Sequence, residues 1–525
     1  MNPSAERPGG PRQPHVVIVG GGIAGLAAAF FLRDEPVRVT VLEGSPRLGG
    51  KLSVSEVAGV AVDEGAEALL VTRPEGTGLI AQVGLAGERV EPGTTSSAIW
   101  TLGAFRPLPR RQFMGVPSDM TELARSGVVS AEGVARAERD LELAPTDRDG
   151  DVPVAAYVGD RLGAEVVDRL VDPLLGGVYA GRSAELSFDA TLPALAAASR
   201  RYRSLAEAAG SLLPPPSDPG AVPAGTRPGS GPDPAPAGPR SGGSVFTTLA
   251  GGLGLLPAFL AKASGADVRA ASMARALSRS PAAPGTPAAP GAPGMPGGGP
   301  GWRLTAGSAA AEEQVDADAV ILAVPARPAA RLLAAVPGTA AAVTALGEIS
   351  YASMAIVTLA YPRSAFPGAG LGPLGWSGYL VPAVDGRAVK AVTFSTVKWP
   401  HLAGLTEAGA EPLEIVRCSV GRIGEEAVLQ RADDELAALA AAELAEATGV
   451  RGAPVAHRVT RWGGALPQYT VGHLDRVARI RAALATQPGL AVCGAAYDGV
   501  GIPACIATAR SAATAVMAHL NRRTS

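Results

Sequence analysis

A glycine-rich hexapeptide, GGGIAG, follows a short apolar run near the N-terminus and has the spacing of a dinucleotide-binding turn. Gly20 would permit the tight turn, Gly22 would let the backbone approach a diphosphate, and Gly25 would let helix and strand pack closely. The first residues of the next helix, Ile23 and Ala24, would offer free N–H groups at a positive dipole end. This turn predicts a cofactor that contains ADP, with NAD and FAD both open.

A second set of residues separates those two cofactors. Glu43 ends the next β-type run, roughly 20 residues after the turn, where its carboxylate could accept from ribose hydroxyls. The sequence RLGGK follows, and its adjacent glycines would present N–H groups to the diphosphate a second time. This extended pattern resembles the amine-oxidase-like FAD proteins more than NAD dehydrogenases. We therefore expect FAD, with further contacts from Arg47, Gly49, Gly50 and Lys51.

Three further stretches resemble cofactor-contacting parts of those FAD proteins. Residues 63–67, DEGAE, resemble the stretch along the flavin ring, where Gly65 and Ala66 would make the contact. Residues 249–253, LAGGL, resemble the loop before a helix and a cofactor-contacting strand, and in that strand Val268 would touch adenine through its backbone. A glycine-rich turn near the C-terminus would return to the diphosphate and the flavin, with contacts from Gly494, Val500, Gly501 and Ile502.

Five stretches point to one family within that superfamily. They are DP and GVYAG within 172–181, KWPH at 398–401, RCSVGR at 417–422, LPQYTVGH at 466–473, and GVGIPAC at 499–505. Together they resemble the bacterial protoporphyrinogen/coproporphyrinogen oxidases, of the Gram-positive coproporphyrinogen III oxidase type. The resemblance runs from about residue 15 to 520 and skips two segments rich in Pro and Gly, 214–243 and 280–300, which depart from the family pattern.

The resemblance implies the FAD-dependent oxidation of coproporphyrinogen III to coproporphyrin III in heme biosynthesis. Six electrons would leave in three hydride transfers to flavin N5, and O₂ would reoxidise the flavin with release of three H₂O₂. Since the flavin accepts the hydride, no catalytic side chain is expected. The alternatives are a protoporphyrinogen IX oxidase, more remotely a flavin amine oxidase or desaturase, and a non-catalytic carrier of FAD or tetrapyrrole.

The substrate carries propionates, so the resemblance implies basic side chains around its pocket. Arg73, which follows the flavin-ring stretch, and Arg110 are the candidate propionate partners. Tyr179 is a candidate for the wall of the tetrapyrrole cavity. The aromatic and histidine side chains of the KWPH and LPQYTVGH stretches are expected to be core or turn residues.

Composition excludes several other classes of function. Three cysteines without a C-x-x-C pair and five scattered histidines give no basis for a disulfide framework or a metal site. A net charge of −2 gives no reason to expect nucleic acid. Residues 1–14 lack the apolar core of a signal peptide, and no uncharged run of about 18 apolar residues predicts an integral membrane segment. We expect a cytoplasmic protein, in transient contact at most with a downstream chelatase.

The elements that must position these residues begin and end the chain. The pattern predicts strands at 15–19, 37–42, 319–324, 355–360, 388–395, 415–420 and 490–493, and helices at 23–33, 131–143, 164–170, 433–450 and 503–520. Further strand-like pieces at 267–279 and 302–305 flank the second Pro/Gly-rich segment, which would be a long hairpin tip.

The predicted fold class is α/β: a discontinuous Rossmann-like FAD-binding domain, a substrate domain with a mixed sheet, and a mostly helical inserted block. The FAD-binding domain would comprise 15–109, which leads into the substrate domain, 244–330 and 476–525. The helical block would span 110–212 and the substrate domain 331–475. Disorder is expected for 1–14, 213–243 and 280–300, because Pro- and Gly-rich sequence buries too little apolar surface to offset its ordering entropy.

Overall fold

A five-stranded parallel sheet, to which three distant parts of the chain contribute, organises one half of the molecule. The computed structural model describes residues 12–144, 148, 150–215, 244–280, 301–308, 310–368, 370–404 and 411–524. In sheet order the parallel strands are β12 (Asp267–Arg269), β2 (Arg38–Leu42), β1 (His15–Val19), β16 (Ala319–Leu322) and β22 (Leu490–Val492).

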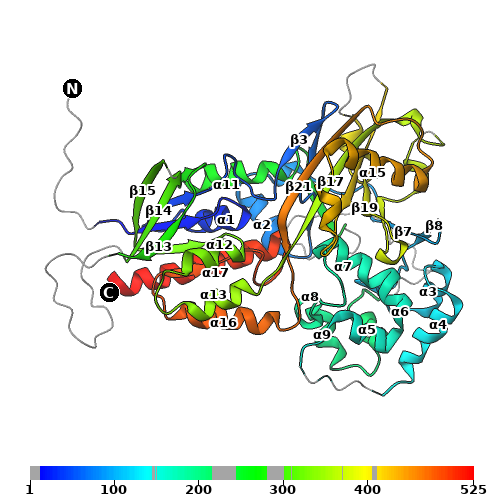
Figure 1. The fold of residues 1–525 in the computed structure, drawn as a ribbon, viewed down its shortest axis with the longest axis horizontal. Coiled ribbons are helices and arrows are strands. Elements are labelled where there is room, and N and C mark those ends of the chain that lie inside the picture. The colour runs from blue at the N-terminus through cyan, green and yellow to red at the C-terminus, as the bar shows by residue number, and fades with distance from the viewer. Residues whose placement is uncertain are drawn as a thin grey trace, which may run out of the picture.

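Both faces of this sheet are covered, which is why its strands are apolar almost throughout. One face packs against α1 (Ile23–Phe31), α2 (Pro74–Gln82), α11 (Leu256–Ser264) and α17 (Ile502–Thr524). The other packs against α12 (Ala326–Leu333), α13 (Ala340–Gly347), α16 (His473–Ala485) and the antiparallel strands β13 (Ala276–Arg279), β14 (Trp302–Ser308) and β15 (Ala311–Ala317). The first and last helices of the chain, α1 and α17, are thus in contact (Figure 1).

A seven-stranded mixed sheet forms the second half of the molecule. Its order is β21 (Ala456–Pro467), β17 (Tyr351–Pro362), β20 (Leu413–Val420), β19 (Val389–Phe394), β18 (Gly378–Leu380), β7 (Ala98–Thr101) and β8 (Ala104–Pro107). Neighbouring strands run antiparallel except β18 and β7. Helix α15 (Asp433–Thr448) packs its Leu436, Ala440 and Leu444 into the core of this sheet.

A helical block hangs below the mixed sheet in Figure 1. Its helices are α3 (Met120–Ser126), α4 (Ala131–Glu138), α5 (Val154–Leu162), α6 (Ala164–Val166), α7 (Asp172–Tyr179), α8 (Phe188–Thr191), α9 (Pro193–Ser199) and α10 (Leu205–Ser211). Buried Asp140 pairs with Arg161 of α5 and also accepts from the N–H of Ala206 at 2.9 Å, which ties α5 to α10. The block has a hydrophobic core of its own.

Short strands and one short helix connect these parts. They are β3 (Val54–Val57), β4 (Val60–Asp63), β5 (Leu69–Leu70), β6 (Arg89–Val90), β9 (Gln112–Phe113), β10 (Val116–Pro117), β11 (Phe246–Leu249) and α14 (Ser395–Lys398). Strand β11 lies between β5 and β6, so after the helical block the chain is again close to the flavin-ring stretch, residues 63–67.

The α/β class and the mixed sheet are confirmed, and most predicted elements are present with shifted ends. The run 267–279 is not one strand. It divides into β12 of the parallel sheet and β13 of an antiparallel sheet, because Ala271 and Ser272 bend away to donate their N–H groups to Ser45 O and Glu43 O, both at 2.8 Å. Strands β13 and β14 do pair as a hairpin around the second Pro/Gly-rich segment.

Two helices also end earlier than predicted. Helix α4 gives way to a 3₁₀ turn, Arg139–Leu141, that turns Asp140 into the buried pair with Arg161, and α6 continues as a π-helical stretch, Val167–Val171. Residues 1–11, 216–243 and 281–300, where disorder was predicted, lie outside the described residues. Residues 12–14 are described, and the Arg12 guanidinium donates to the Asp318 carboxylate at 2.7 Å.

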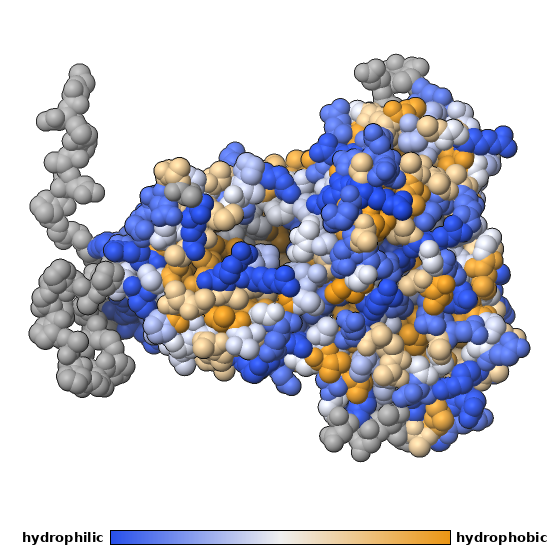
Figure 2. Space-filling view, in the orientation of Figure 1, coloured by the Kyte–Doolittle hydropathy of each residue, from blue (hydrophilic) through white to orange (hydrophobic). Residues whose placement is uncertain are grey.

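On the face shown in Figure 2, hydrophilic and hydrophobic residues are interspersed. Within the part of the chain that the structure describes, no helix has both the length and the apolar character required to cross a membrane.

Candidate active site

The first glycine turn has the geometry that close approach of two backbones requires. Gly20 has a φ of +111°, and a Cβ there would lie 2.6 Å from Ala323 O at the end of β16. A Cβ on Gly25 would lie 1.8 Å from Gly20 O, because α1 packs directly on the turn that precedes it. Neither position accepts a side chain without movement of the backbone.

Gly22 and Gly50 are glycines for a different reason. The second glycine pair folds against the first turn, and the N–H of Gly49 donates to Gly21 O at 2.8 Å. A Cβ on Gly22 would meet only the Cα of Gly50, at 4.0 Å, so open space lies over both. Helix α1 begins beside this open space, with Gly22 as its N-cap residue, and no side chain caps its N-terminus. An uncapped helix start beside a cradle that any Cβ would fill fits the diphosphate of FAD.

Glu43 and Arg47 hold this cradle in shape. The Glu43 carboxylate accepts from the N–H of Gly21 and from that of Ser45, both at 2.7 Å, so it fixes the turn and keeps lone pairs for a further donor. Arg47 donates to Gly50 O at 2.8 Å and lies over the Trp462 ring. Val268 lies on β12, the edge strand of the parallel sheet, next to Val41.

The flavin-ring segment, residues 63–67, leaves β4 and passes over Lys51. A Cβ on Gly65 would lie 2.0 Å from Lys51 O, and the N–H of Ala66 donates to that same oxygen at 3.3 Å. Burial lowers the pKa of Lys51. Glycine at 65 is therefore required by backbone packing, which brings the segment predicted for the ring next to the residues predicted for the diphosphate.

Glu67 anchors the far end of this segment through two cations. Lys398 and Arg417 both pair with its carboxylate, and the other terminal nitrogen of Arg417 donates to Gly65 O at 2.7 Å. Burial alone would raise the pKa of Glu67, but the two cations lower it to about 2. The cluster is mostly enclosed, since the side chains of Arg417, Glu67 and Lys398 are exposed by only 7%, 14% and 19%.

Glu64 and Asp63 are also occupied by protein. The Glu64 carboxylate pairs with Arg458 at 2.5 Å and accepts from Ser53 at 2.8 Å, while its backbone oxygen accepts from Trp462 Nε1 at 2.9 Å. Asp63 accepts from the N–H groups of the LAGGLG loop, residues 249–254, and burial raises its pKa to about 6. All three acidic side chains thus hold the segment in place, and the contact of Gly65 and Ala66 with the flavin ring stays a prediction.

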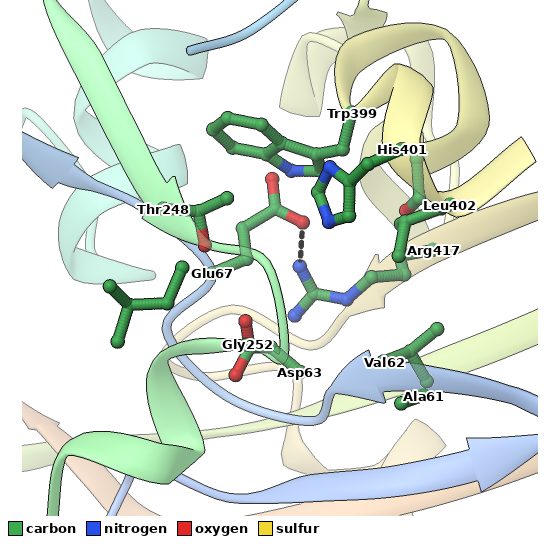
Figure 3. A pocket seen from close by; sticks show the side chains of 12 residues that line it. Ala61, Val62, Asp63, Glu67, Thr248, Gly252, Trp399, His401, Leu402 and Arg417 are labelled. Atoms are coloured by element: carbon green, nitrogen blue, oxygen red, sulfur yellow. Dashed lines mark hydrogen bonds and ion pairs between the residues drawn. The ribbon is translucent and has the colours of Figure 1, made fainter. Parts of the chain in front are cut away.

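A small cavity of about 20 Å³ lies beside Glu67, large enough for one water molecule and far too small for a tetrapyrrole. Figure 3 shows the Glu67 carboxylate between the Trp399 ring and the Arg417 guanidinium. Four buried polar atoms of its lining have no hydrogen-bond partner in the described protein: Ser395 Oγ, Trp399 Nε1, His401 Nδ1 and Arg417 Nε. The cavity is therefore lined by residues that hold the flavin-ring segment in place, among them Glu67 and Arg417.

The closing turn, residues 494–501, joins β22 to α17. Gly494 has a φ of +116° and donates its N–H to Thr508 Oγ1 at 3.0 Å. Helix α17 starts at Ile502, and a Cβ on Gly494 would meet Ala24 of α1 at 3.7 Å. The start of the closing turn therefore lies against the first turn of α1. Val500 packs on the core of the helical block.

Within the described chain, no hydrogen bond, ion pair or ring contact joins the three predicted substrate residues. Arg73 is exposed and lies 3.6 Å from Glu75, and Arg110 is also exposed. Tyr179 is only 6% exposed, and burial raises its pKa to about 12. Their assignment to the substrate stays a prediction.

Sequence reasoning did not assign partners to the residues that support the flavin-ring segment. Lys398 and Arg417 lie within the KWPH and RCSVGR stretches, which was the available signal, but Arg458 and Trp462 had none. Among the described residues, no group of three or more His, Cys, Asp or Glu side chains could hold a metal ion.

Comparison with known proteins agrees with this geometry. The family model described as flavin containing amine oxidoreductase matches residues 23–517. The coproporphyrinogen III oxidases of Mycobacterium tuberculosis and Bacillus subtilis are 35% and 29% identical to the chain, over 96% of it and over 97% and 98% of their own lengths. The protoporphyrinogen oxidase of Macaca fascicularis is 28% identical, over 96% of the chain and 98% of its own length.

Solved structures share the fold. A crystal structure from Exiguobacterium sp. 255-15 superposes with a TM-score of 0.77 at 27% identity, and covers 98% of this chain and 100% of that one. A putrescine oxidase variant, at 17% identity and a TM-score of 0.64, covers 96% and 99%, and shows likeness of fold alone. The glycine cradle, the flavin-ring segment and the family match along nearly the whole sequence lead to one conclusion: the chain belongs to the flavin containing amine oxidoreductase family, and its cofactor is FAD.

Proposed function

We propose that the protein oxidises coproporphyrinogen III to coproporphyrin III in heme biosynthesis. The observation that carries this proposal is its 35% identity, over 96% of the chain, to a curated coproporphyrinogen III oxidase. Protoporphyrinogen IX is the second candidate substrate, favoured by the likeness to the macaque enzyme. The reaction would take place in the cytoplasm, with transient contact with a chelatase that receives the product.

When bound, FAD supplies at N5 the hydride acceptor for three two-electron steps, and O₂ takes the electrons onward as H₂O₂. The role of the chain is to bind FAD, to orient its flavin ring and to enclose it. The backbone at Gly22 and Gly50 would approach the diphosphate, Glu43 would accept from ribose, and Val268 would meet adenine with its backbone. The ring would lie along Gly65 and Ala66, and the closing turn with Ile502 would cover it.

The support for an oriented ring lies in the contacts of the flavin-ring segment. Its acidic side chains are all taken up by protein, so they are not free to act as general bases. Arg417 aligns the peptide by donating to Gly65 O. Arg73 and Arg110, both exposed, would donate charge-assisted hydrogen bonds to the propionate carboxylates of the substrate.

Purified holoenzyme given each porphyrinogen in air, with porphyrin fluorescence and H₂O₂ followed together, tests the proposal. We expect coproporphyrin to form faster than protoporphyrin, with about three H₂O₂ per porphyrin and no turnover without O₂. A clear preference for protoporphyrinogen IX would move the assignment to the second candidate. Flavin that neither porphyrinogen reduces would overturn both.

A further inference from the structure

The loop between β21 and α16 carries the stretch QYTVGH, and its aromatic residues are fully enclosed. Tyr469 is 2% exposed and His473 is 0% exposed. In sequence the stretch precedes the closing turn, with 26 positions between Tyr469 and Ala495, and only core or turn roles were predicted for its aromatic and histidine side chains. In the folded chain it lies directly against the closing turn of the flavin site.

The Tyr469 hydroxyl bridges the closing turn. It donates to Ala495 O at 2.7 Å and accepts from the N–H of Gly499 at 2.8 Å. Gly499 has a φ of +141°, a conformation that only glycine adopts readily. One side chain thereby sets the separation of the two ends of the turn.

The rest of the same loop holds the Tyr469 ring in position. The ring stacks on the His473 imidazole, with centroids 3.7 Å apart and an interplanar angle of 13°. Burial lowers the pKa of His473 to about 4, so the ring is neutral near pH 7, and its Nε2–H donates to Tyr497 O at 3.0 Å. The closing turn is therefore fastened at three backbone groups by two stacked rings.

Tyr469 also reaches the helical block. Its ring lies 5.6 Å from that of Tyr179 at the end of α7, and its neighbour Gln468 donates to Tyr179 O at 2.8 Å. Tyr179 is the residue predicted to line the tetrapyrrole cavity. One side chain therefore contacts both the turn predicted to cover the flavin and the wall predicted to meet the substrate.

We propose that Tyr469 is a positioning residue: its hydroxyl holds the closing turn in the shape that binds FAD, and its ring couples that turn to Tyr179. The proposal rests on FAD as the cofactor and not on which porphyrinogen is the substrate. Two hydrogen bonds to half-buried backbone groups, Ala495 O and the N–H of Gly499, are lost when the hydroxyl is removed.

The experiment compares Tyr469→Phe with Tyr497→Phe in the full-length holoenzyme. Tyr497 is as deeply buried, at 1% exposed, and lies in the closing turn, but its hydroxyl has no partner in the described protein. Serial dilution of the holoenzyme, followed by flavin fluorescence, gives the Kd for FAD. Tyr469→Phe should raise this Kd about tenfold or more and shift the flavin absorption band, whereas Tyr497→Phe should change the Kd less than about twofold.

A second variant keeps the test decisive if Tyr469→Phe does not fold. Thr508→Val removes the hydroxyl that accepts from the N–H of Gly494 at the start of the same turn, and it too should weaken FAD binding several-fold. The coupling is read from a double-mutant cycle of Tyr179→Leu and Tyr469→Phe, whose effects on the Kd should not be additive. An unchanged Kd and spectrum in Tyr469→Phe, or an equal loss in Tyr497→Phe, would overturn the proposal.

Discussion

The two ends of the predicted flavin site are stabilised by different kinds of interaction. At the diphosphate end, residues 20–25 and 49–50 lie in direct backbone contact, with contacts as short as 1.8 Å to an added Cβ, and the charged side chains that support them, Glu43 and Arg47, come from the same short stretch of sequence. At the ring end, residues 63–67 are held by buried carboxylates paired with cations from distant strands. Close approach is a local property of glycine, whereas the orientation of a peptide needs partners from elsewhere in the fold.

The largest expected effect separates two glycines within the first turn. Gly25→Ala should prevent folding, because its Cβ would lie 1.8 Å from Gly20 O. Gly22→Val should fold, since Gly22 has an ordinary φ of −77° and open space beside it, but should lose FAD because the side chain fills the diphosphate cradle. Circular dichroism melting together with flavin absorbance checks both. A folded Gly22→Val protein that retains its flavin would refute the assignment of the cradle.

The next effect tests the buried charges of the ring end. Glu67→Gln would leave Lys398 and Arg417 without their anion, and should lower the free energy of unfolding by about 3–5 kcal/mol. The control is Glu446→Gln, which breaks the exposed pair with Arg387 and should cost about 0–1 kcal/mol. Urea denaturation measures both. Equal costs would mean that the ring end does not depend on its ion pairs.

Proton linkage should show opposite slopes for two carboxyls of the same segment. The pKa of Glu67 is lowered to about 2, so its stabilisation is complete above its unfolded pKa near 4.5 and is lost as pH falls toward 2. The pKa of Asp63 is raised to about 6, so its contribution to stability increases as pH falls from about 6 to 4. Urea titrations at a series of pH values should show the first slope missing in Glu67→Gln and the second missing in Asp63→Asn.

The smallest effect concerns the exposed arginines, which belong to neither end. Arg73→Ala should change the free energy of unfolding by less than about 0.5 kcal/mol, because its side chain is 51% exposed. If it contacts a propionate equally in ground and transition states, KM for the porphyrinogen should rise severalfold while kcat stays constant. Steady-state kinetics in air measures this, with Arg110→Ala alongside. An unchanged KM in either variant removes that arginine from the substrate site.

Much of the nucleotide-binding half could be predicted because its determinants are close in sequence. Strand β1, the glycine turn and α1 form one continuous stretch, and the predicted strand at 15–19 matches the structure. The run at 267–279 was wrongly predicted as one strand-like piece, because both of its halves have strand-like composition. Only the hydrogen bonds of Ala271 and Ser272 to the loop after β2 decide where the chain turns.

The ring end could be located but not explained. Residues 63–67 carry three carboxylates that suggest chemistry when read alone, yet each is neutralised or hydrogen-bonded by a partner that sequence spacing does not reveal. Lys398 and Arg417 lie 331 and 350 residues from Glu67. The same holds for the LPQYTVGH stretch. Its residues could be singled out from the sequence, but their contact with the closing turn is seen only in the folded chain.

The sequence by itself determined the cofactor class, the α/β fold and the places where backbone must come close to backbone or to a ligand, because glycine and apolar periodicity act over a few residues. Only the tertiary structure decided which charges meet, which carboxyls are spent on support and which side chain bridges the closing turn. Ion pairs such as those of Glu67 join residues more than 300 positions apart, so the packing of the sheets decides which side chains meet.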